Sequence, residues 1–340
     1  MLDARHREVH IWIMRVCFVG SQGLEEHGAK ALPDLLARKD GFAWIDVPEW
    51  DEQAEVTLSG LLHAHPMVIE ACRRRNHVPT VHGYEEHIFV TVHAPLVGEP
   101  GHVHLLELDQ IVGCNYLVTV HGPVNPVVDP REALTETDGV MRRIEAGRFR
   151  PRSPSEASYA LVSAVARRQR TAIGTVAEKL PALEQQVMAG DFRQPEALLE
   201  EMFLIRHELL TVRTMAAQSF DVYARITSLE RMVSEEDRPY AHDLTEQFER
   251  VRSIGDGEAQ FLYGVIDLYQ TRVSTKMTVA MERLAVITAI TLPITAIASV
   301  YGMNVIVNQS THWMQLGIVL LVMLTISAFL LRWARRQGWW

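Results

Sequence analysis

The chain has 340 residues, of which 48% are apolar, and a formal net charge of -9. Its length exceeds that of one typical domain, so a soluble domain joined to a membrane part is the natural division. The excess of acidic residues argues against a nucleic-acid partner, which would require a basic face. An acidic chain suits cations as partners, although solubility alone explains such a balance in most proteins.

Short β-rich runs alternate with turn residues in the first part of the chain. Strands are expected at residues 11–19, 42–47, 87–96, 103–108 and 110–120, and helices around residues 28–37 and 52–71. This pattern predicts a cytoplasmic α/β domain over residues 1–150. The run at residues 11–19 is too short for a secretory signal and is interrupted by Arg15.

Cysteine usage fits a reducing compartment. Cys17, Cys72 and Cys114 are far apart and form no Cys-x-x-Cys pair. A zinc ribbon and a thioredoxin-like site are therefore not expected, and reduced thiols in a cytoplasmic domain are.

The segment Gly23–Lys30 has the glycine spacing of a phosphate-binding loop, but it lacks the terminal Gly-Lys-Ser/Thr. Ala29 interrupts the motif, Ala31 offers no hydroxyl for a metal, and two glutamates would face the phosphates. We therefore expect no nucleotide cofactor.

Nine histidines fall between His63 and His121. His102 and His104 share one face of a strand, and three others are candidates to lie near them: His82, His87 and His93. A regulatory zinc or cobalt site is one interpretation. Scattered surface and half-buried histidines are the other, and it is favoured because no Cys or carboxylate stands at ligand spacing.

A helical stalk domain is predicted over residues 151–283. Ser153 is expected to cap a helix with Glu156 three residues later. Helical pattern runs to Gly190, then over residues 195–233, and a long helix of about 237–302 continues into the membrane, with Asp237 as a plausible N-cap. At 1.5 Å per residue this last helix would be about 100 Å long. Its apolar stripe is expected to pack against sister copies around an axis, or against one copy in a coiled-coil dimer.

Two apolar runs predict transmembrane helices at residues 284–302 and 313–331, joined by an outer loop at 303–312 and followed by a basic cytoplasmic tail at 332–340. Basic residues flank the inner ends of both runs, whereas residues 305–312 contain none. The positive-inside bias therefore places both termini in the cytoplasm. A plain membrane anchor is the alternative interpretation of this hairpin.

The first span ends in Tyr301-Gly302-Met303-Asn304. This motif, at the end of the first of two terminal spans and after a long stalk, resembles the signature of the CorA family of magnesium channels. The resemblance is firm from about residue 237 to residue 340, and two earlier strands are similar to the opening domain of that family. It implies a funnel-shaped homopentamer in the inner (plasma) membrane, which takes up hydrated Mg2+ and also transports Co2+ or Ni2+ in some forms.

The resemblance also assigns site residues. Gly302, Met303 and Asn304 would form the selectivity filter, in which the Asn304 amide oxygens accept hydrogen bonds from the water shell of Mg2+. The matching pore-lining positions are polar rings at Thr295 and Thr278, a hydrophobic gate at Leu292, Leu284 and Met281, and an acidic ring at Asp267.

Gating is expected to depend on cytoplasmic Mg2+. Bound Mg2+ would cancel the repulsion between acidic side chains of neighbouring subunits and close the pore, and its loss would release them. Asp243 matches the regulatory residue of the family on the stalk, and Glu85 and Glu86 are the nearest acidic candidates for its partner.

Two alternatives remain open from the sequence. A ZntB-like Zn2+ transporter is encouraged by the histidines but opposed by Met303. A membrane-anchored receptor or enzyme is the second, but no Ser/His/Asp, Cys/His or paired-carboxylate constellation stands out, so enzymatic activity is not expected. The outer loop departs from the family pattern because residues 305–312 include no acidic side chain.

Overall fold

The computed structural model describes residues 13–98, 101–123, 125–190, 195–228, 233–302 and 313–336. The chain divides into two compact units. Unit 1 comprises residues 1–186 and 192–263, and unit 2 comprises residues 187–191 and 264–340.

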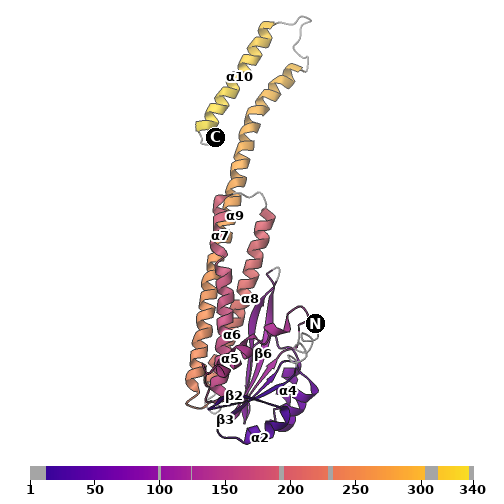
Figure 1. The fold of residues 1–340 in the computed structure, drawn as a ribbon. Helices are drawn as coiled ribbons and strands as arrows, with labels where there is room; N and C mark the ends of the chain where they lie inside the picture. Colours follow the sequence, from indigo (N-terminus) through magenta and orange to yellow (C-terminus); the bar gives the residue numbers. More distant parts are fainter. Residues whose placement is uncertain are drawn as a thin grey trace. The chain divides into compact units, whose positions relative to one another are not determined.

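Unit 1 contains a mixed seven-stranded sheet with the strand order β2-β1-β3-β7-β6-β5-β4 (Figure 1). The β3 and β7 strands are parallel, and every other neighbouring pair is antiparallel. The strands are β1 (Arg15–Gly20), β2 (Gly23–His27), β3 (Gly41–Val47), β4 (Thr80–Gly83), β5 (His87–Val97), β6 (Val103–Gly113) and β7 (Tyr116–His121).

The helices are of two kinds. Short ones follow the first strands: η1 (Ala29–Ala31), α2 (Leu32–Ala37), α3 (Glu52–Val56), η2 (Thr57–Leu61), α4 (Pro66–Arg73), η3 (Pro130–Glu132) and α5 (Thr135–Glu145). Longer ones follow: α6 (Pro154–Ala177), α7 (Leu180–Ala189), α8 (Pro195–Ser228), α9 (Arg238–Gly302) and α10 (Trp313–Arg336).

Alternating side chains of β3 bury both faces of the sheet. Phe42 and Trp44 are buried in one core cluster, whereas Ala43, Ile45 and Val47 are buried in another. This alternation follows from the two-residue period of a strand, and a strand that is buried on both sides becomes almost continuously apolar.

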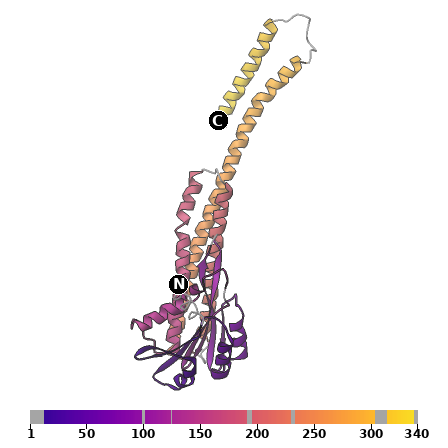
Figure 2. The same ribbon diagram turned by 45° about the vertical axis from the view of Figure 1, so that its right-hand side comes forward.

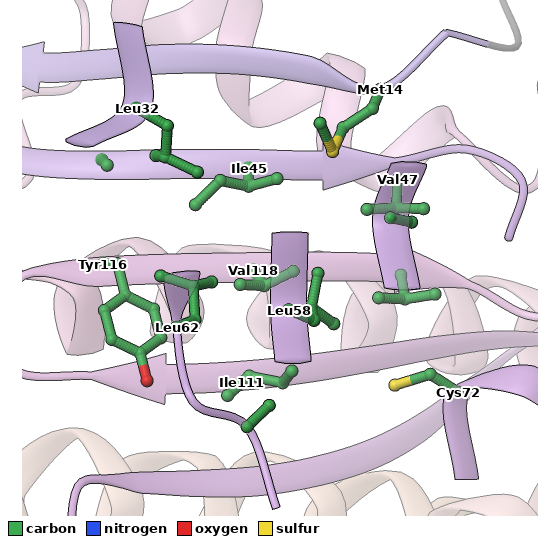
Figure 3. Close-up of a cluster of buried hydrophobic side chains, with 14 of the residues drawn as sticks. Met14, Leu32, Ile45, Val47, Leu58, Leu62, Cys72, Ile111, Tyr116 and Val118 are labelled. Atoms are coloured by element: carbon green, nitrogen blue, oxygen red, sulfur yellow. The ribbon is translucent and has the colours of Figure 1, made fainter. Parts of the chain in front are cut away.

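The cluster that contains Ala43, Ile45 and Val47 lies between the sheet and the short helices α2, η2 and α4 (Figure 3). Leu32 of α2, Leu58 of η2 and Cys72 of α4 are buried against Ile45 and Val118 of the sheet. Burial of each aliphatic side chain of this size contributes about 1.5 to 3 kcal/mol, so this layer fixes the short helices to the sheet.

The opposite face is covered by α5, α6, α8 and the part of α9 that belongs to unit 1. Of these, α6, α8 and this part of α9 lie side by side in both views of the chain (Figures 1 and 2). The predicted N-cap of α6 is confirmed, because the Ser153 hydroxyl accepts a hydrogen bond from the Glu156 backbone N–H at 3.1 Å.

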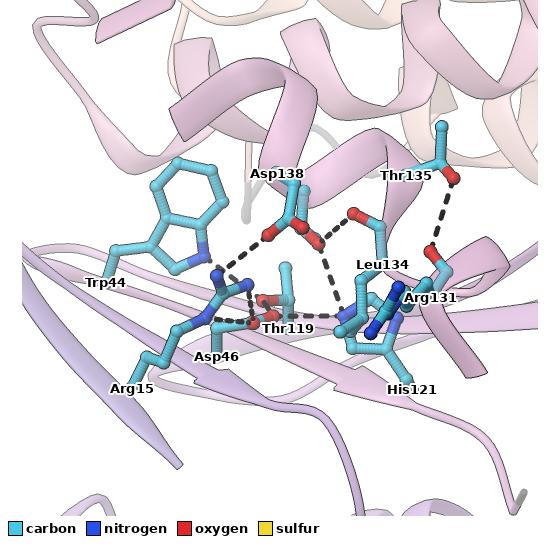
Figure 4. A network of polar contacts seen from close by, with 10 residues as sticks. Arg15, Trp44, Asp46, Thr119, His121, Arg131, Leu134, Thr135 and Asp138 are labelled. Atoms are coloured by element: carbon cyan, nitrogen blue, oxygen red, sulfur yellow. Dashed lines mark hydrogen bonds and ion pairs between the residues drawn. The ribbon is translucent and has the colours of Figure 1, made fainter. Parts of the chain in front are cut away.

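A buried polar network anchors α5 and β1 to the centre of the sheet (Figure 4). The carboxylate of Asp46 accepts hydrogen bonds from Arg15 and from the Thr119 hydroxyl, and it lies 3.0 Å from His121 Nε2. Arg15 extends the network to Asp138 of α5 at 2.7 Å. Burial opposes ionisation of Asp46, but His121 and Arg15 outweigh it and hold the pKa of that carboxyl well below its usual range.

Several predicted elements differ from the structure. The predicted boundary between a strand at residues 103–108 and a strand at residues 110–120 is wrong. The β6 strand runs without a break from Val103 to Gly113, and the chain turns only after Gly113. The β2 and β4 strands and the α5 helix were not predicted. The near phosphate-loop segment forms β2, which pairs with β1 as an edge strand. The short β2 strand, GLEEH, and the short β4 strand, TVHG, carry too few apolar residues to show a strand period.

The predicted apolar stripe of the long helix, which begins with Leu244, Phe248 and Val251, is also corrected. These three residues are buried within unit 1 and are not left for a sister copy. Further along α9, Phe261, Val273 and Met277 of the predicted stripe are 41%, 40% and 62% exposed, so these positions stay uncovered by the described residues. Asp237 precedes α9 as expected, but its carboxylate accepts hydrogen bonds from the hydroxyls of Ser155 and Ser234.

Candidate ion pathway and cation sensor

In unit 2, α9 continues from Gly264 to Gly302, and α10 runs beside its last turns (Figure 2). Both helices are long and apolar enough to span a membrane. Only 6% of the apolar stretch of α9, and none of that of α10, is buried by other parts of the described chain. A core helix of a soluble protein would be mostly buried, so these two helices have the surface of membrane-spanning segments.

The six predicted pore-lining residues share one side of α9. With 3.6 residues per turn, their positions fall within an arc of about 120°. Leu292, Leu284 and Met281 on this side are 64%, 62% and 53% exposed, and Asp267, Thr278 and Thr295 are exposed as well. We call this the exposed stripe of α9.

The other side of α9 is half-buried. The partly buried positions of its apolar stretch are Val286, Ile290, Pro293, Ile294 and Ile297, and they lie opposite the exposed stripe. A matching row recurs on α10 at Val319, Met323, Ile326, Ser327 and Leu330. In a single copy, the described residues cover one side of α9 in part and leave the exposed stripe uncovered.

Threonine hydroxyls on α9 donate hydrogen bonds to the helix itself. Thr295 Oγ1 donates to the Thr291 carbonyl at 2.8 Å, and Thr278 Oγ1 donates to the Ser274 carbonyl at 3.0 Å. This satisfies the hydroxyl proton and leaves lone pairs of the oxygen free. Both threonine oxygens therefore keep the capacity to accept a further hydrogen bond.

The predicted filter falls at the end of α9. Gly302 is the last residue of the helix and is exposed, whereas Met303, Asn304 and the outer loop through His312 lie outside the described residues. The carboxyl end of a helix carries a partial negative charge, which suits a cation site.

Asp243 occupies the part of α9 that belongs to unit 1. Its Oδ2 accepts a hydrogen bond from the Tyr159 hydroxyl at 2.7 Å and another from Gln247 Nε2 at 2.6 Å. Its Oδ1 accepts none from the described part of the chain. Burial and the bond to Asp243 together raise the pKa of Tyr159, so the phenol stays protonated and keeps donating. Sequence reasoning missed Tyr159 and Gln247, although the four-residue spacing of Gln247 from Asp243 on one helix pointed to the second.

The carboxylates of Glu85 and Glu86 lie in the loop between β4 and β5, where both are exposed. Among the described residues, neither forms an ion pair or hydrogen bond with Asp243. A single copy therefore does not bring the two predicted halves of the sensor together.

The comparisons with known proteins agree on one family. The family model described as CorA-like Mg2+ transporter protein matches residues 39–336. The chain belongs to the CorA-like Mg2+ transporter family. The CorA family consists of ion transporters and not of enzymes, and this chain is a divalent metal ion transporter of the CorA type.

Curated CorA relatives cover most of the chain. A protein of Bacillus subtilis (strain 168), YfjQ, provisionally named as a metal ion transporter, is 25% identical over 300 residues, which are 87% of this chain and 89% of that protein. The cobalt/magnesium transport protein CorA of Thermotoga maritima is 22% identical over 281 residues, which are 81% of this chain and 76% of that protein.

The CorA fold is matched along almost its whole length. The complete structure of the CorA magnesium transporter from Methanocaldococcus jannaschii has a TM-score of 0.78 at 18% identity, and the match covers 96% of this chain and 99% of that one. This confirms the predicted fold class of an amino-terminal α/β domain, a long helix and two apolar carboxy-terminal helices. A ZntB cytoplasmic domain from Vibrio parahaemolyticus is less similar, with a TM-score of 0.57 at 8% identity over 77% of this chain.

Among the described residues of this CorA-type chain, the histidines do not converge on a metal site. The rings of His102 and His104 lie 4.6 Å apart, while His93 is buried and its Nε2 lies 2.6 Å from the Asn76 carbonyl. Within the described ranges, no group of three or more His, Cys, Asp or Glu side chains is arranged to hold a metal. The described part of the structure thus offers no support for the zinc interpretation of the histidines.

Proposed function

We propose that this chain is a channel that takes up hydrated Mg2+, with Co2+ and Ni2+ as further cargo, through a pore formed by α9 of several copies. The observation that carries the proposal is the exposed stripe of α9. It carries every predicted pore-lining residue, lies opposite the half-buried side, and leads to the Gly302-Met303-Asn304 motif.

A homo-oligomer follows from the same stripe, and a pentamer is the assembly we propose from the family resemblance. Leu292 and Leu284 would be costly to leave in a water-filled lumen, but they line a constriction that closes by dewetting. Thr295 and Thr278 would offer hydroxyl oxygens above and below it, and Asp267 would attract cations at the inner mouth.

The filter would act on Mg2+ with its water shell intact. Mg2+ loses water reluctantly and prefers octahedral geometry, so a ring of neutral Asn304 oxygens that bonds to metal-bound water avoids the cost of dehydration. Uptake needs no further energy source, because a divalent cation gains roughly 4.6 kcal/mol per 100 mV of inside-negative potential. We place the protein in the inner (plasma) membrane with both termini in the cytoplasm.

Regulation would depend on Asp243. With Oδ2 held by Tyr159 and Gln247, Oδ1 is the oxygen that remains for Mg2+. Mg2+ shared with an acidic residue of a neighbouring copy, for which Glu85 and Glu86 are the candidates, would hold the copies together and close the pore. Asp243→Ala is expected to leave transport less sensitive to internal Mg2+, and unchanged inhibition would contradict this role.

Flux in reconstituted liposomes tests the proposal. Wild-type protein should take up Mg2+ under an inside-negative potential, Asn304→Ala should abolish the uptake, and Asn308→Ala, a matched change in the same loop, should preserve it. Zn2+ uptake driven by a proton gradient would instead support the ZntB-like alternative. Absence of any flux from folded wild-type protein would support a membrane-anchored receptor.

A further inference from the structure

Four arginine side chains line one groove in unit 1, apart from the proposed pore. The groove has a volume of about 470 Å³ and is formed by α5, α6 and α9. Arg143 comes from α5, Arg167 and Arg170 from α6, and Arg250 from α9. Arg167 and Arg170 are three residues apart and therefore project from one face of α6.

None of these four guanidinium groups forms an ion pair with a carboxylate of the described residues. Their neighbours do: Arg168 bonds to Glu132 at 2.9 Å, and Arg252 bonds to Glu249 at 2.8 Å. In a chain with a net charge of -9, an unpaired cluster of this kind is a local exception. Arginines without carboxylate partners leave their forked donors free for a ligand.

The carboxylates of the groove do not neutralise the arginines. Asp243 is held by Tyr159 and Gln247, and the Glu246 carboxylate lies 3.5 Å from His242 Nδ1. Four positive charges thus line the groove with two negative ones, both of which come from α9.

The wall of the groove around Asp243 is polar but already hydrogen-bonded. Gln247 Nε2 donates to the Ser163 oxygen at 3.2 Å, and the Ser163 hydroxyl is hydrogen-bonded to the Tyr159 hydroxyl, so the free donors of the groove are those of the arginines. The Arg143 guanidinium carbon lies 5.0 Å from the centre of the Phe149 ring, which limits the directions in which this side chain points.

We propose that this groove binds an oligophosphate anion, as free pyrophosphate or tripolyphosphate or as the phosphate chain of a nucleotide. Guanidinium groups match phosphate oxygens in pairs, and several of them on separate helices match several phosphates better than one carboxylate. The volume accommodates a chain of two or three phosphates with its water. The groove adjoins Asp243 of the proposed sensor, but the proposal rests on the four arginines and not on the transport function.

Isothermal titration calorimetry on the full-length protein in detergent tests the proposal with three probes: pyrophosphate, tripolyphosphate and ATP. Wild-type protein should bind at least one of them, and Arg167→Gln/Arg170→Gln should weaken that binding at least about tenfold because two charge-assisted contacts are lost. The matched control Arg148→Gln/Arg225→Gln removes the same charge at exposed positions outside the groove and should leave the affinity within about twofold. Arg167→Lys/Arg170→Lys should lie between wild type and the glutamine variant, because charge remains and the fork is lost.

Equal affinity for ATP and tripolyphosphate would assign the site to the phosphate chain alone, and tighter ATP binding would assign it to a nucleotide. Absence of heat with all three probes would overturn the proposal. An equal loss of affinity in the groove variant and in the control variant would also overturn the proposal, because net charge alone would then explain the effect. A groove variant that changes only the oligomeric state in light scattering, with no anion bound by the wild type, would make the groove a contact between copies.

Discussion

The Tyr159 hydroxyl on α6 donates a 2.7 Å hydrogen bond to Asp243 on α9, although the two residues are 84 positions apart in the chain. The bond occupies Oδ2 and orients the carboxylate, and Oδ1 is the oxygen that we propose for the regulatory cation. Residues that orient a metal-binding carboxylate typically change metal affinity by 10- to 100-fold when they are removed.

Tyr159→Phe is therefore expected to raise the internal Mg2+ concentration that half-inhibits transport by about tenfold. Tyr240→Phe is the matched control, because the ring of Tyr240 lies beside that of Tyr159 at 5.1 Å and its hydroxyl bonds to Arg152. The measurement is Mg2+ flux into liposomes with graded internal Mg2+. Equal responses of the two variants would remove Tyr159 from the sensor.

The hydrophobic gate can be tested at Leu292. Leu292→Ala shortens an exposed apolar side chain on the exposed stripe and should allow flux to persist at high internal Mg2+, because a wider and less apolar constriction wets more easily. Ile287→Ala makes a similar change at a position that is 56% exposed but lies outside the stripe. Persistent flux in both variants, or in neither, would argue against Leu292 as part of the gate.

The Asp46 network is expected to dominate the stability of the sheet. Asp46→Asn leaves Arg15 and His121 without their shared carboxylate and should cost about 3 to 5 kcal/mol in the free energy of unfolding. Asp138→Asn, at a side chain that is 32% exposed and bonds only to Arg15 in this network, should cost about 1 kcal/mol or less. Chemical denaturation of the full-length protein in detergent provides both values.

The pH dependence of this contribution follows from the lowered pKa of Asp46. Burial opposes the shift, and His121 and Arg15 produce it. A carboxyl whose pKa is lower in the folded state stabilises the protein above the unfolded value of about 3.9 and loses that contribution as the pH falls through the folded value. The difference in stability between wild type and Asp46→Asn should therefore shrink only in strong acid. A difference that already vanishes at neutral pH would contradict the assignment.

Gly41 should tolerate no side chain. A Cβ atom at this position would lie 2.1 Å from the Val19 carbonyl oxygen on the adjacent strand and 2.8 Å from the Phe18 ring. Gly41→Ala is expected to cost about 3 kcal/mol, or to prevent folding, because β1 and β3 would have to separate. Gly28→Ala meets nothing within 4 Å at a backbone φ of -76° and should be nearly neutral. Thermal unfolding measures the stability of the two variants. A Gly41→Ala variant as stable as the wild type would refute the steric argument.

Thiol reactivity should distinguish the three cysteines. Burial raises the pKa of Cys17 to about 12 and also raises that of Cys72, whereas Cys114 is exposed. Because the thiolate is the reactive form, maleimide at pH 7.5 to 9 should label one thiol per native chain. The native Cys114→Ser variant should not be labelled. Mass spectrometry gives the count, and denaturation should release the other two sites. Early labelling of Cys17 would show that β1 opens readily.

The sequence alone determined the elements whose signals are local. The two apolar runs, the long helix and the Ser153 cap depend on residues within a few turns of each other, and α9 and α10 follow the predicted boundaries closely. The family motif at Gly302 is local in the same sense. By contrast, the short polar strands β2 and β4 carry no period of their own and form only because a neighbouring strand offers hydrogen bonds.

Only the tertiary structure decided which distant residues meet. The parallel pairing of β3 with β7, the contact of Tyr159 with Asp243 and the gathering of four arginines from three helices all join segments that are remote in the chain. Leu244 and Phe248 repeat at the same helical spacing as Val273 and Met277, yet the first two are buried by their own chain and the last two are exposed. Periodicity fixes the side of a helix on which a residue lies, whereas the partner that covers that side is set by packing across the whole fold.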